Sequence, residues 1–556
     1  MSGRFVEQAA TEPTSGGRLE QLDMGPDAAA TETPAAPRPK RKKPLAFHLS
    51  FAGLMITILV VSLDATTLAV ALPVITTELK GTTLEAFWAN IAFLLAMVVV
   101  QPMYASFSDA MGRVVPLHVS LLLFAVGSVV FAVARSMAVV IAGRVLQGLG
   151  AGGLDVLGEI IVTDMTTLRE RPLYFGLLGL PMAAGAILGP ILGAVLAEYA
   201  GWRWIGWINL PLVFVSAVLL GFFLRLRTLP QPLWVRLRSI DWLGLALFTT
   251  GCSALVLPLS WAQVMFPWSS WQTLVPLVVG AVLLVVFAVY EGKPSNPIFP
   301  HRIFASGTAS STLIQVFCHG LIVYCGLAFL PLFFQAVRLE TPLQSGVSML
   351  PLTIVSVVAS VASPLLVQWM HRYCPNMWLG WVLQAVGEGL LALLSQTSSR
   401  AEMSGIQVVA ALGIGALYQV LAVPMQASAP TVDDTGLAMG ILVTFRLLGG
   451  LVGLAVGTTI FTSIFAESIR PLLPLAGPLE ALKDANQAVG FIPVLRELDL
   501  PHEVLNPVIN AYLRSLRGIW YFLAAVAVTG FVSSWFTKEL SLDKEDMGRQ
   551  QFVSSD

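Results

Sequence analysis

Apolar stretches recur along most of this chain, separated by short polar breaks. Each is about as long as the ~20-residue helix that crosses the ~30 Å hydrocarbon core of a bilayer. Backbone polar groups in hydrocarbon must pair within their own segment, so these stretches are predicted to be helices. The fold class is therefore predicted to be all-α, a polytopic membrane protein with fourteen transmembrane helices. They are expected at 46–73, 86–108, 115–134, 138–163, 173–198, 204–224, 242–261, 272–290, 308–334, 346–369, 376–396, 405–428, 437–463 and 519–537.

Basic residues orient these helices. The segment 1–44 is rich in Ala, Thr, Pro and Gly, closes with a basic run at 38–43, and is predicted to be a disordered cytoplasmic tail. With that tail inside, the short inner loops hold ten Lys and Arg and the short outer loops five, as the positive-inside rule expects. The even number of spans places the second tail, 541–556, on the same side. The long outer loop 464–518 is predicted to be a loosely helical cap.

Composition excludes several classes of protein. Charged residues make up 12% of the chain, about half the share in soluble domains, and mean hydropathy is +0.77. The net charge of −1 offers no basic surface for nucleic acid. Four scattered cysteines do not suggest a disulfide framework or a zinc site. A GxGxxG pattern at 148–153 lies inside an apolar stretch with no strand before it, so nucleotide binding is not expected. No catalytic motif was found, and the protein is not expected to be an enzyme.

Ionisable residues within the predicted spans point to function, because they are costly in a membrane. The clearest are Asp64, Arg144, Asp155, Glu159, Glu388 and Arg446. Arg144, Asp155 and Glu159 follow a spacing of three to four residues with Gly148 and Gly152, so they share one helix face. Arg144 and Asp64 are expected at similar depths and could meet if their spans are neighbours. A purely structural ion pair and a role in coupling or substrate binding both remain open for them.

Several motifs occur in order along the chain. The first spans are marked by LDATTLAVALP at 63–73, QPMYASFSDAMGR at 101–113, RVLQGLGAGG at 144–153 and GAILGPILGA at 185–194. Further matches are GWRW at 201–204, NLP at 209–211 and LPLFFQ at 330–335. Over about 45–540 the sequence resembles the major facilitator superfamily, and specifically the fourteen-span drug:proton antiporters of fungi. It departs from the family pattern at Ala69, Ala105, Val114 and Ala194.

The motif residues have physical roles to match. Gly112 permits a tight turn, while Asp109 and Arg113 beside it can pair at the inner face and latch a gate. Gly185, Gly189 and Gly193 repeat every four residues and allow close helix contact. Pro190 removes one backbone hydrogen bond and can bend the helix. For the glycines, simple packing and a gating role are both open.

Asp155 and Glu159 stand where related transporters usually carry small or neutral residues. Burial and the mutual proximity of two carboxyls at i, i+4 both favour a group that exchanges a proton. These two residues are therefore candidates for proton coupling, with hydrogen-bonded structural carboxyls as the alternative.

The resemblance implies a secondary transporter that exports a small organic molecule, such as a secondary metabolite, glycolipid, toxin or drug, in exchange for protons. Two six-helix halves, 45–224 and 308–540, are expected to rock about a central site lined by spans 1, 4 and 5 and their counterparts, with 225–307 inserted between them. Cavity candidates in the second half, chosen as polar groups in apolar helices, are Gln315, His319, Tyr324, Gln384, Tyr418 and Gln419, beside Glu388 and Arg446.

Other expectations concern partners and alternatives. The partners expected are cargo, protons and the lipid bilayer, with no cofactor, no metal and no nucleic acid, for a monomer in the plasma membrane with both termini cytoplasmic. One alternative keeps transport but makes the cargo an organic anion such as a dicarboxylate, clamped by Arg144 and Arg446. A channel or membrane sensor would need a charge ring or a soluble domain, and neither is visible in the sequence.

Overall fold

The computed structural model describes residues 43–79, 83–167, 170–226, 234, 238, 240–262, 266–294, 297–431, 434–472, 477–483, 488, 491–498 and 501–540. Every regular element among these residues is a helix, which confirms the all-α prediction, and no sheet is formed among them. The predicted tails lie outside the described residues, except for Lys43 and Pro44.

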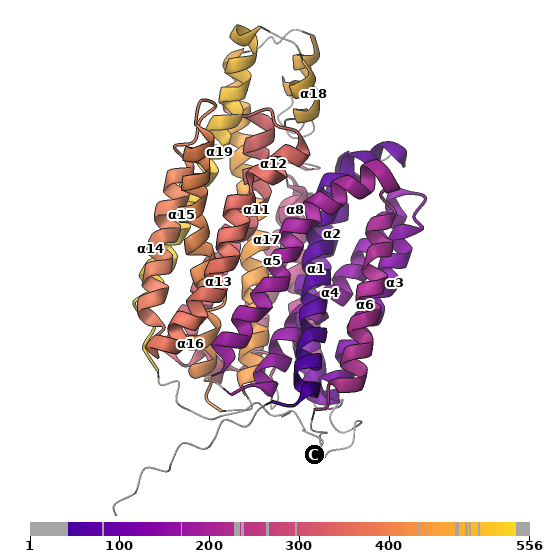
Figure 1. The fold of residues 1–556 in the computed structure, drawn as a ribbon, viewed down its shortest axis with the longest axis vertical. Helices are drawn as coiled ribbons and strands as arrows, with labels where there is room; N and C mark the ends of the chain where they lie inside the picture. The colour runs from indigo at the N-terminus through magenta and orange to yellow at the C-terminus, as the bar shows by residue number, and fades with distance from the viewer. Residues whose placement is uncertain are drawn as a thin grey trace, which may run out of the picture. The chain divides into compact units, whose positions relative to one another are not determined.

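The helices fall into three consecutive sets along the chain (Figure 1). The N-terminal helix group comprises α1 (Leu45–Glu78), α2 (Thr83–Met111), α3 (Val114–Ala132), α4 (Met137–Met165), α5 (Arg171–Val195), the π-helix η1 (Leu196–Ala200) and α6 (Trp204–Phe223). The inserted helix pair is α8 (Trp242–Trp261) and α9 (Trp271–Tyr290). After the short α10 (His301–Phe304), the C-terminal helix group comprises α11 (Gly307–Ala336), α12 (Pro342–Ser348), α13 (Leu350–Met370), α14 (Cys374–Leu391), α15 (Arg400–Tyr418), α16 (Ala422–Ala427), α17 (Asp434–Ile469), η2 (Arg470–Leu472), η3 (Gly477–Lys483), α18 (Ile492–Glu497) and α19 (His502–Ser534).

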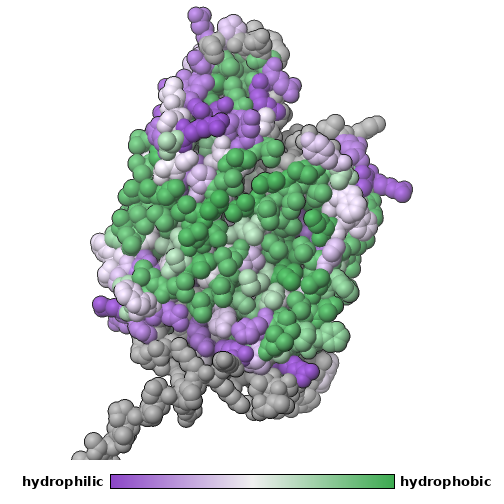
Figure 2. All heavy atoms as spheres, in the orientation of Figure 1, coloured by the Kyte–Doolittle hydropathy of each residue, from purple (hydrophilic) through white to green (hydrophobic). Residues whose placement is uncertain are grey.

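Each of the fourteen predicted stretches contains a helix, but fewer have the length and composition of a membrane span. Among the described residues, twelve helices are long and apolar enough to cross a bilayer. The apolar part of α8, Trp242–Pro258, is shorter, and α14 carries Asn376, Gln384 and Glu388 within 18 residues. Fourteen spans therefore stay a prediction. On the face shown in Figure 2, hydrophobic residues cover the middle of the bundle and hydrophilic residues gather at its ends, as expected for a protein embedded in lipid.

Glycines bring α4 and α2 into close contact. A Cβ on Gly148 would lie 2.4 Å from the Phe93 carbonyl oxygen, and one on Gly152 would lie 2.5 Å from the Met97 carbonyl oxygen. Any larger side chain at these two positions would push α4 away from α2. The glycines thus place α4, with the charged residues on its length, deep inside the N-terminal helix group.

The loop after α2 has the tight turn that the sequence predicts. Gly112 has φ +86°, a left-handed conformation that strains residues with a Cβ. This turn lies at the end of the bundle where α1 begins and α19 ends, which we call the base (Figure 1). It places Arg113 at the start of α3, facing the end of α4.

At the base the two helix groups touch. A Cβ on Gly436 of α17 would lie 3.0 Å from Arg113 Nη2, and one on Gly440 would lie 3.1 Å from Ala105 Cβ of α2. A Cβ on Gly179 of α5 would likewise lie 2.7 Å from Ser360 Oγ of α13. The N-terminal and C-terminal helix groups are therefore in direct contact.

The two ends of the predicted outer loop 464–518 are helical in the structure, as continuations of α17 and α19. α17 continues to Ile469, and α19 begins at His502, well before the predicted start of the last span. Both extensions pack on each other, because the Phe465 and Tyr512 rings lie 4.7 Å apart and the Tyr512 hydroxyl donates to the Ala488 carbonyl at 2.6 Å. This contact keeps the chain helical beyond the length that a membrane requires. The described part of the loop also contains α18, as the prediction of a loosely helical cap implies.

Candidate functional site

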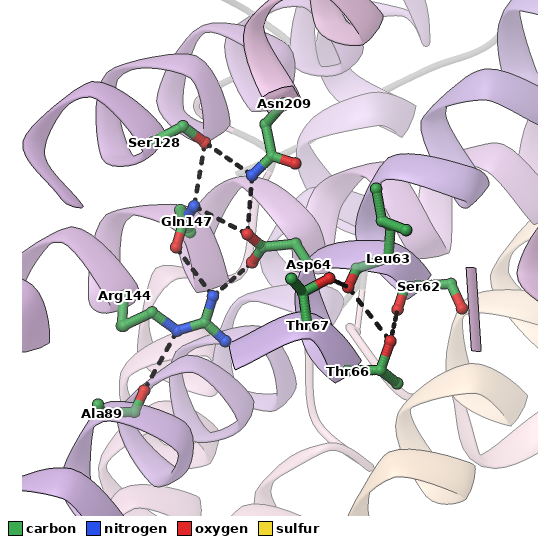
Figure 3. Close-up of polar contacts among 10 residues, drawn as sticks. All are labelled: Ser62, Leu63, Asp64, Thr66, Thr67, Ala89, Ser128, Arg144, Gln147 and Asn209. Atoms are coloured by element: carbon green, nitrogen blue, oxygen red, sulfur yellow. Dashed lines mark hydrogen bonds and ion pairs between the residues drawn. The ribbon is translucent and has the colours of Figure 1, made fainter. Parts of the chain in front are cut away.

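Asp64 and Arg144 form an ion pair in the interior of the N-terminal helix group, with both side chains 1% exposed (Figure 3). The sequence places Asp64 and Arg144 at similar depths, and in the structure α1 and α4 are neighbours, so the two side chains meet. Gln147 donates to Asp64 at 3.1 Å and Asn209 of α6 donates to it at 2.7 Å. Gln147 also accepts from Arg144 at 2.9 Å. Three helices therefore hold one carboxylate.

Other groups of the protein surround this pair, although Arg144 Nη2 has no hydrogen-bond partner among the described residues. Arg144 Nε donates to the Ala89 carbonyl at 3.3 Å, and the guanidinium lies 4.1 Å from the centre of the Phe93 ring. Ser128 of α3 accepts from Gln147 at 3.0 Å and so brings α3 into the network. The pair therefore lies among contacts from α2, α3, α4 and α6.

A second charged cluster lies where α4 meets α17, between the two helix groups. Arg446 Nη1 lies 3.6 Å from Glu159 Oε1, and the two side chains are 5% and 8% exposed. Asp155, one turn from Glu159 on α4, accepts from Gln101 of α2 at 2.9 Å. We call Asp155, Glu159 and Arg446 the seam cluster, because it joins residues from both helix groups.

Arg446 is also held from the side of α15. Its Nη2 donates to the Tyr418 carbonyl at 2.9 Å, and its guanidinium lies 4.3 Å from the centre of the Tyr418 ring. His319 of α11 packs edge-on against the other part of that ring, with centroids 5.6 Å apart, and its Nε2–H donates to the Ile414 carbonyl at 3.0 Å. Tyr418 therefore contacts both His319 and Arg446.

A third charged cluster lies at the base. Arg113 donates to Asp164 at 2.9 Å and Asp109 at 2.5 Å, and it donates to Ser108 at 2.6 Å. The expected pair of Asp109 and Arg113 is thus part of a larger cluster that includes the end of α4. Arg113 also lies against α17, through Gly436.

A hydrogen bond between side chains of the two helix groups lies at the same end. Arg171, at the start of α5, donates to Gln426 of α16 at 3.0 Å and to the Thr163 carbonyl at 3.1 Å. This hydrogen bond and the contact of α17 with α2 both join the N-terminal helix group to the C-terminal helix group at the base.

The repeated glycines of α5 face α1, within the N-terminal helix group. A Cβ on Gly185 would lie 2.6 Å from Ser62 Cβ, and a Cβ on Gly189 or Gly193 would come still closer to Thr66 or Thr67. α5 runs as one helix through Pro190. The glycines therefore serve close packing of α5 on α1, and any gating role would have to act through that contact.

A cavity with about 620 Å³ of empty space, its open mouth included, lies between α5 and the C-terminal helix group. None of its lining residues is charged, and most are apolar. Its lining residues come from α5, α11, α13 and α15, and none of them comes from α1 or α4. The lining residues are Gly179, Met182, Ala183, Ala186, Val323, Leu327, Leu352, Thr353, Ser356, Val357, Ser360, Ile414, Gly415 and Tyr418.

Of the cavity candidates in the second half, only Tyr418 lines this cavity. Gln315 accepts from Trp381 at 2.9 Å and donates to Thr537 at 2.9 Å, inside the C-terminal helix group. Gln384 donates to Glu388 at 2.8 Å on the same helix.

Two further candidates lie near α17 or the seam. Tyr324 packs on α17, where a Cβ on Gly450 would come within 2.3 Å of its ring. Gln419 is buried, and its Oε1 has no hydrogen-bond partner among the described residues.

Several residues of these clusters were not singled out from the sequence. Asn209, Gln147 and Gln101 lay within quoted motifs, which was the signal that could have identified them as partners of charged residues. Gln426 lies in no such motif, so its contact with Arg171 could be found only from the structure.

Comparison with known proteins identifies the family of this chain. Residues 54–454 match the family model described as Major Facilitator Superfamily. The chain is 48% identical over 514 residues to the MFS-type transporter sphD of Aspergillus fumigatus, covering 92% of this chain and 89% of that one. It is 36% identical to the MFS-type efflux pump MMF1 of Pseudozyma antarctica, covering 91% and 93%.

A solved structure shares the fold at low sequence identity. The proton:xylose symporter XylE superposes with a TM-score of 0.55 and 13% identity, over 90% of this chain and 98% of that one. The family model, the relatives and the fold agree with the resemblance seen in the motifs, which is thereby confirmed. This chain belongs to the Major Facilitator Superfamily and is a multi-pass membrane transport protein of the efflux type found in fungi.

Proposed function

We propose that this protein is a proton-coupled antiporter that exports a small, uncharged amphipathic molecule by alternating access. The observation that carries the proposal is the Glu159–Arg446 contact of 3.6 Å between the two helix groups, beside the cavity. An ionisable carboxyl at an interface that must separate during transport can link protonation to movement. The names of the relatives, which include efflux pumps, support the direction of transport.

The seam cluster supplies the coupling in this proposal. When Glu159 is ionised, its attraction to Arg446 holds α4 and α17 together. When Glu159 binds a proton, that attraction is lost and the two helix groups are free to adopt their other packing. Arg446 keeps its charge at any physiological pH and so cannot carry the proton itself. Asp155 lies one turn away and contributes a second carboxyl.

The cavity suggests the class of cargo. Its lining includes Met182, Leu327 and Leu352, while Ser356 and Tyr418 add hydroxyl groups and no residue adds a charge. An apolar molecule with a few polar groups gains most from such surroundings, because its apolar surface leaves water and its polar groups keep partners.

The organic-anion alternative has less support. Arg144 is paired with Asp64 and is 1% exposed, and Arg446 faces Glu159. Neither guanidinium lines the cavity, so neither is placed to clamp an anion there.

A comparison of metabolites tests the export proposal. Deletion of the gene is expected to leave at least one amphipathic compound inside the cells and to deplete it from the medium. Uptake of that compound into inside-out vesicles should rise when the lumen is made acidic and fall when a protonophore is added. Unchanged metabolites would contradict export, and uptake that ignores the pH gradient would contradict proton coupling.

The proposal places the protein in the plasma membrane, with fourteen spans, both termini in the cytoplasm, no cofactor, and activity as a monomer. Epitope tags at residues 1 and 556 should then be protected from protease in intact cells, because an even number of spans returns the chain to the same side. A tag inserted within 470–500 should be cut. Cleavage of either terminal tag would contradict this topology, and permeabilised cells, in which all tags should be cut, provide the control.

A further inference from the structure

Tyr418 is the point at which the cavity and the seam cluster meet. It lines the cavity, its ring lies 4.3 Å from the Arg446 guanidinium, and its carbonyl accepts from Arg446 at 2.9 Å. Among the described residues, no other residue that lines the cavity forms a hydrogen bond or a ring contact with Arg446. A molecule in the cavity can therefore act on Arg446 through Tyr418.

The ring of Tyr418 contacts two side chains that can carry a positive charge, His319 and Arg446. His319 packs edge-on against it at 5.6 Å between centroids, and His319 is fixed in turn by its hydrogen bond to Ile414. The ring thus contacts both an imidazole and a guanidinium. The face of an aromatic ring attracts a cation, so the Tyr418 ring helps to position Arg446.

Arg446 in turn faces Glu159, so a shift of the guanidinium changes the stability of the ionised carboxyl. Other titratable groups surround this pair on each packed element: Asp155 lies on α4 itself, His319 and Tyr324 lie on α11, and Tyr418 lies on α15. Among these groups Arg446 carries the fixed positive charge, and its distance from Glu159 therefore decides how strongly the carboxylate is held.

We infer that Tyr418 is a positioning residue that links occupation of the cavity to the Glu159–Arg446 pair. Cargo packed against the ring holds it over Arg446 and keeps Arg446 close to ionised Glu159, so cargo binding favours release of the proton. Because linkage is reciprocal, protonation of Glu159 weakens cargo binding by the same factor. This inference rests on the proposed function, and it adds the residue through which cargo and proton affect each other.

The test measures binding of Nile red, an uncharged apolar fluorophore, to the purified full-length protein at pH 5.5 and pH 8. The wild-type protein should bind the dye at least about fivefold more tightly at pH 8, the lower end of typical coupling between two sites. In Tyr418→Leu, which removes the ring, the ratio of the two dissociation constants should fall toward 1 while binding at pH 5.5 remains. In Tyr418→Phe, which keeps the ring, the ratio should be close to that of the wild type.

Two control variants separate the possible failures. Leu327→Ala changes the cavity away from Arg446, so it should weaken binding equally at both pH values and leave the ratio unchanged. Glu159→Gln should abolish the ratio with Tyr418 intact. A wild-type ratio of 1 would contradict the proposed proton coupling itself. If the ratio of dissociation constants exceeds fivefold in the wild type and stays there in Tyr418→Leu, only the inference about Tyr418 is overturned. If the wild-type protein does not bind the dye at all, the cavity is not the binding site, and the inference about Tyr418 is overturned as well.

Discussion

Replacement of Glu159 by glutamine is expected to uncouple transport from the proton gradient. Glutamine has the size of glutamate but is neutral at every pH, so the contact with Arg446 no longer changes when a proton arrives. Export should lose its response to an imposed pH gradient, whereas exchange of labelled for unlabelled cargo at equal pH should continue. Flux into reconstituted vesicles with and without a gradient measures both activities.

The chain offers a matched control for this prediction. Glu388 is also a buried carboxyl in an apolar helix, but it accepts from Gln384 on its own helix and forms no ion pair found among the described residues. Glu388→Gln should therefore keep gradient-driven transport. Asp155→Asn should reduce coupling less than Glu159→Gln does, because Gln101 already holds Asp155 within the N-terminal helix group. Full gradient-driven transport by the Glu159→Gln protein would leave that carboxyl as a structural group.

Replacement of Arg144 by alanine should cost about 3–5 kcal/mol of folding free energy and abolish transport, because Asp64 would remain buried without its counter-ion. The network around Asp64 joins α1, α3, α4 and α6, so its loss loosens the whole N-terminal helix group. Thermal unfolding of the purified protein, together with flux in vesicles, measures the two effects.

An exposed ion pair provides the comparison. Arg203 and Glu78 lie 2.6 Å apart with side chains 39% and 47% exposed, and the hydrogen bond from Arg203 lowers the pKa of Glu78. Arg203→Ala should cost only about 0–1 kcal/mol, since solvent screens such pairs. The double variant Asp64→Asn with Arg144→Gln should recover much of the stability that Arg144→Ala loses, because no charge is left unpaired. Equal stability of Arg144→Ala and Arg203→Ala would show that the buried pair does not hold the group together.

The two large effects have different origins, although both residues lie on α4. Arg144 pairs with Asp64 inside one helix group. Glu159 contacts Arg446 across the two helix groups, which the proposed alternating access would separate. From the sequence the two residues share one helix face and could not be told apart in this way.

The amino-acid sequence by itself determined the helices, the approximate number of spans and the family. Hydrophobic length is a local property, and a segment in lipid has no alternative to pairing its own backbone groups. The turn at Gly112 and the proximity of Asp109 to Arg113 also follow from short-range spacing. These features required no knowledge of which helices are neighbours.

The tertiary structure alone decided which charges meet. Asp64 pairs with Arg144 only because α1 packs beside α4, and Glu159 faces Arg446 only because α17 packs against α4 from the other helix group. It also decided that the cavity is lined by α5, α11, α13 and α15, and that the outer loop begins and ends as helical extensions. Spacing along a helix defines the face on which a side chain lies, but the partner opposite that face depends on packing between segments far apart in the chain.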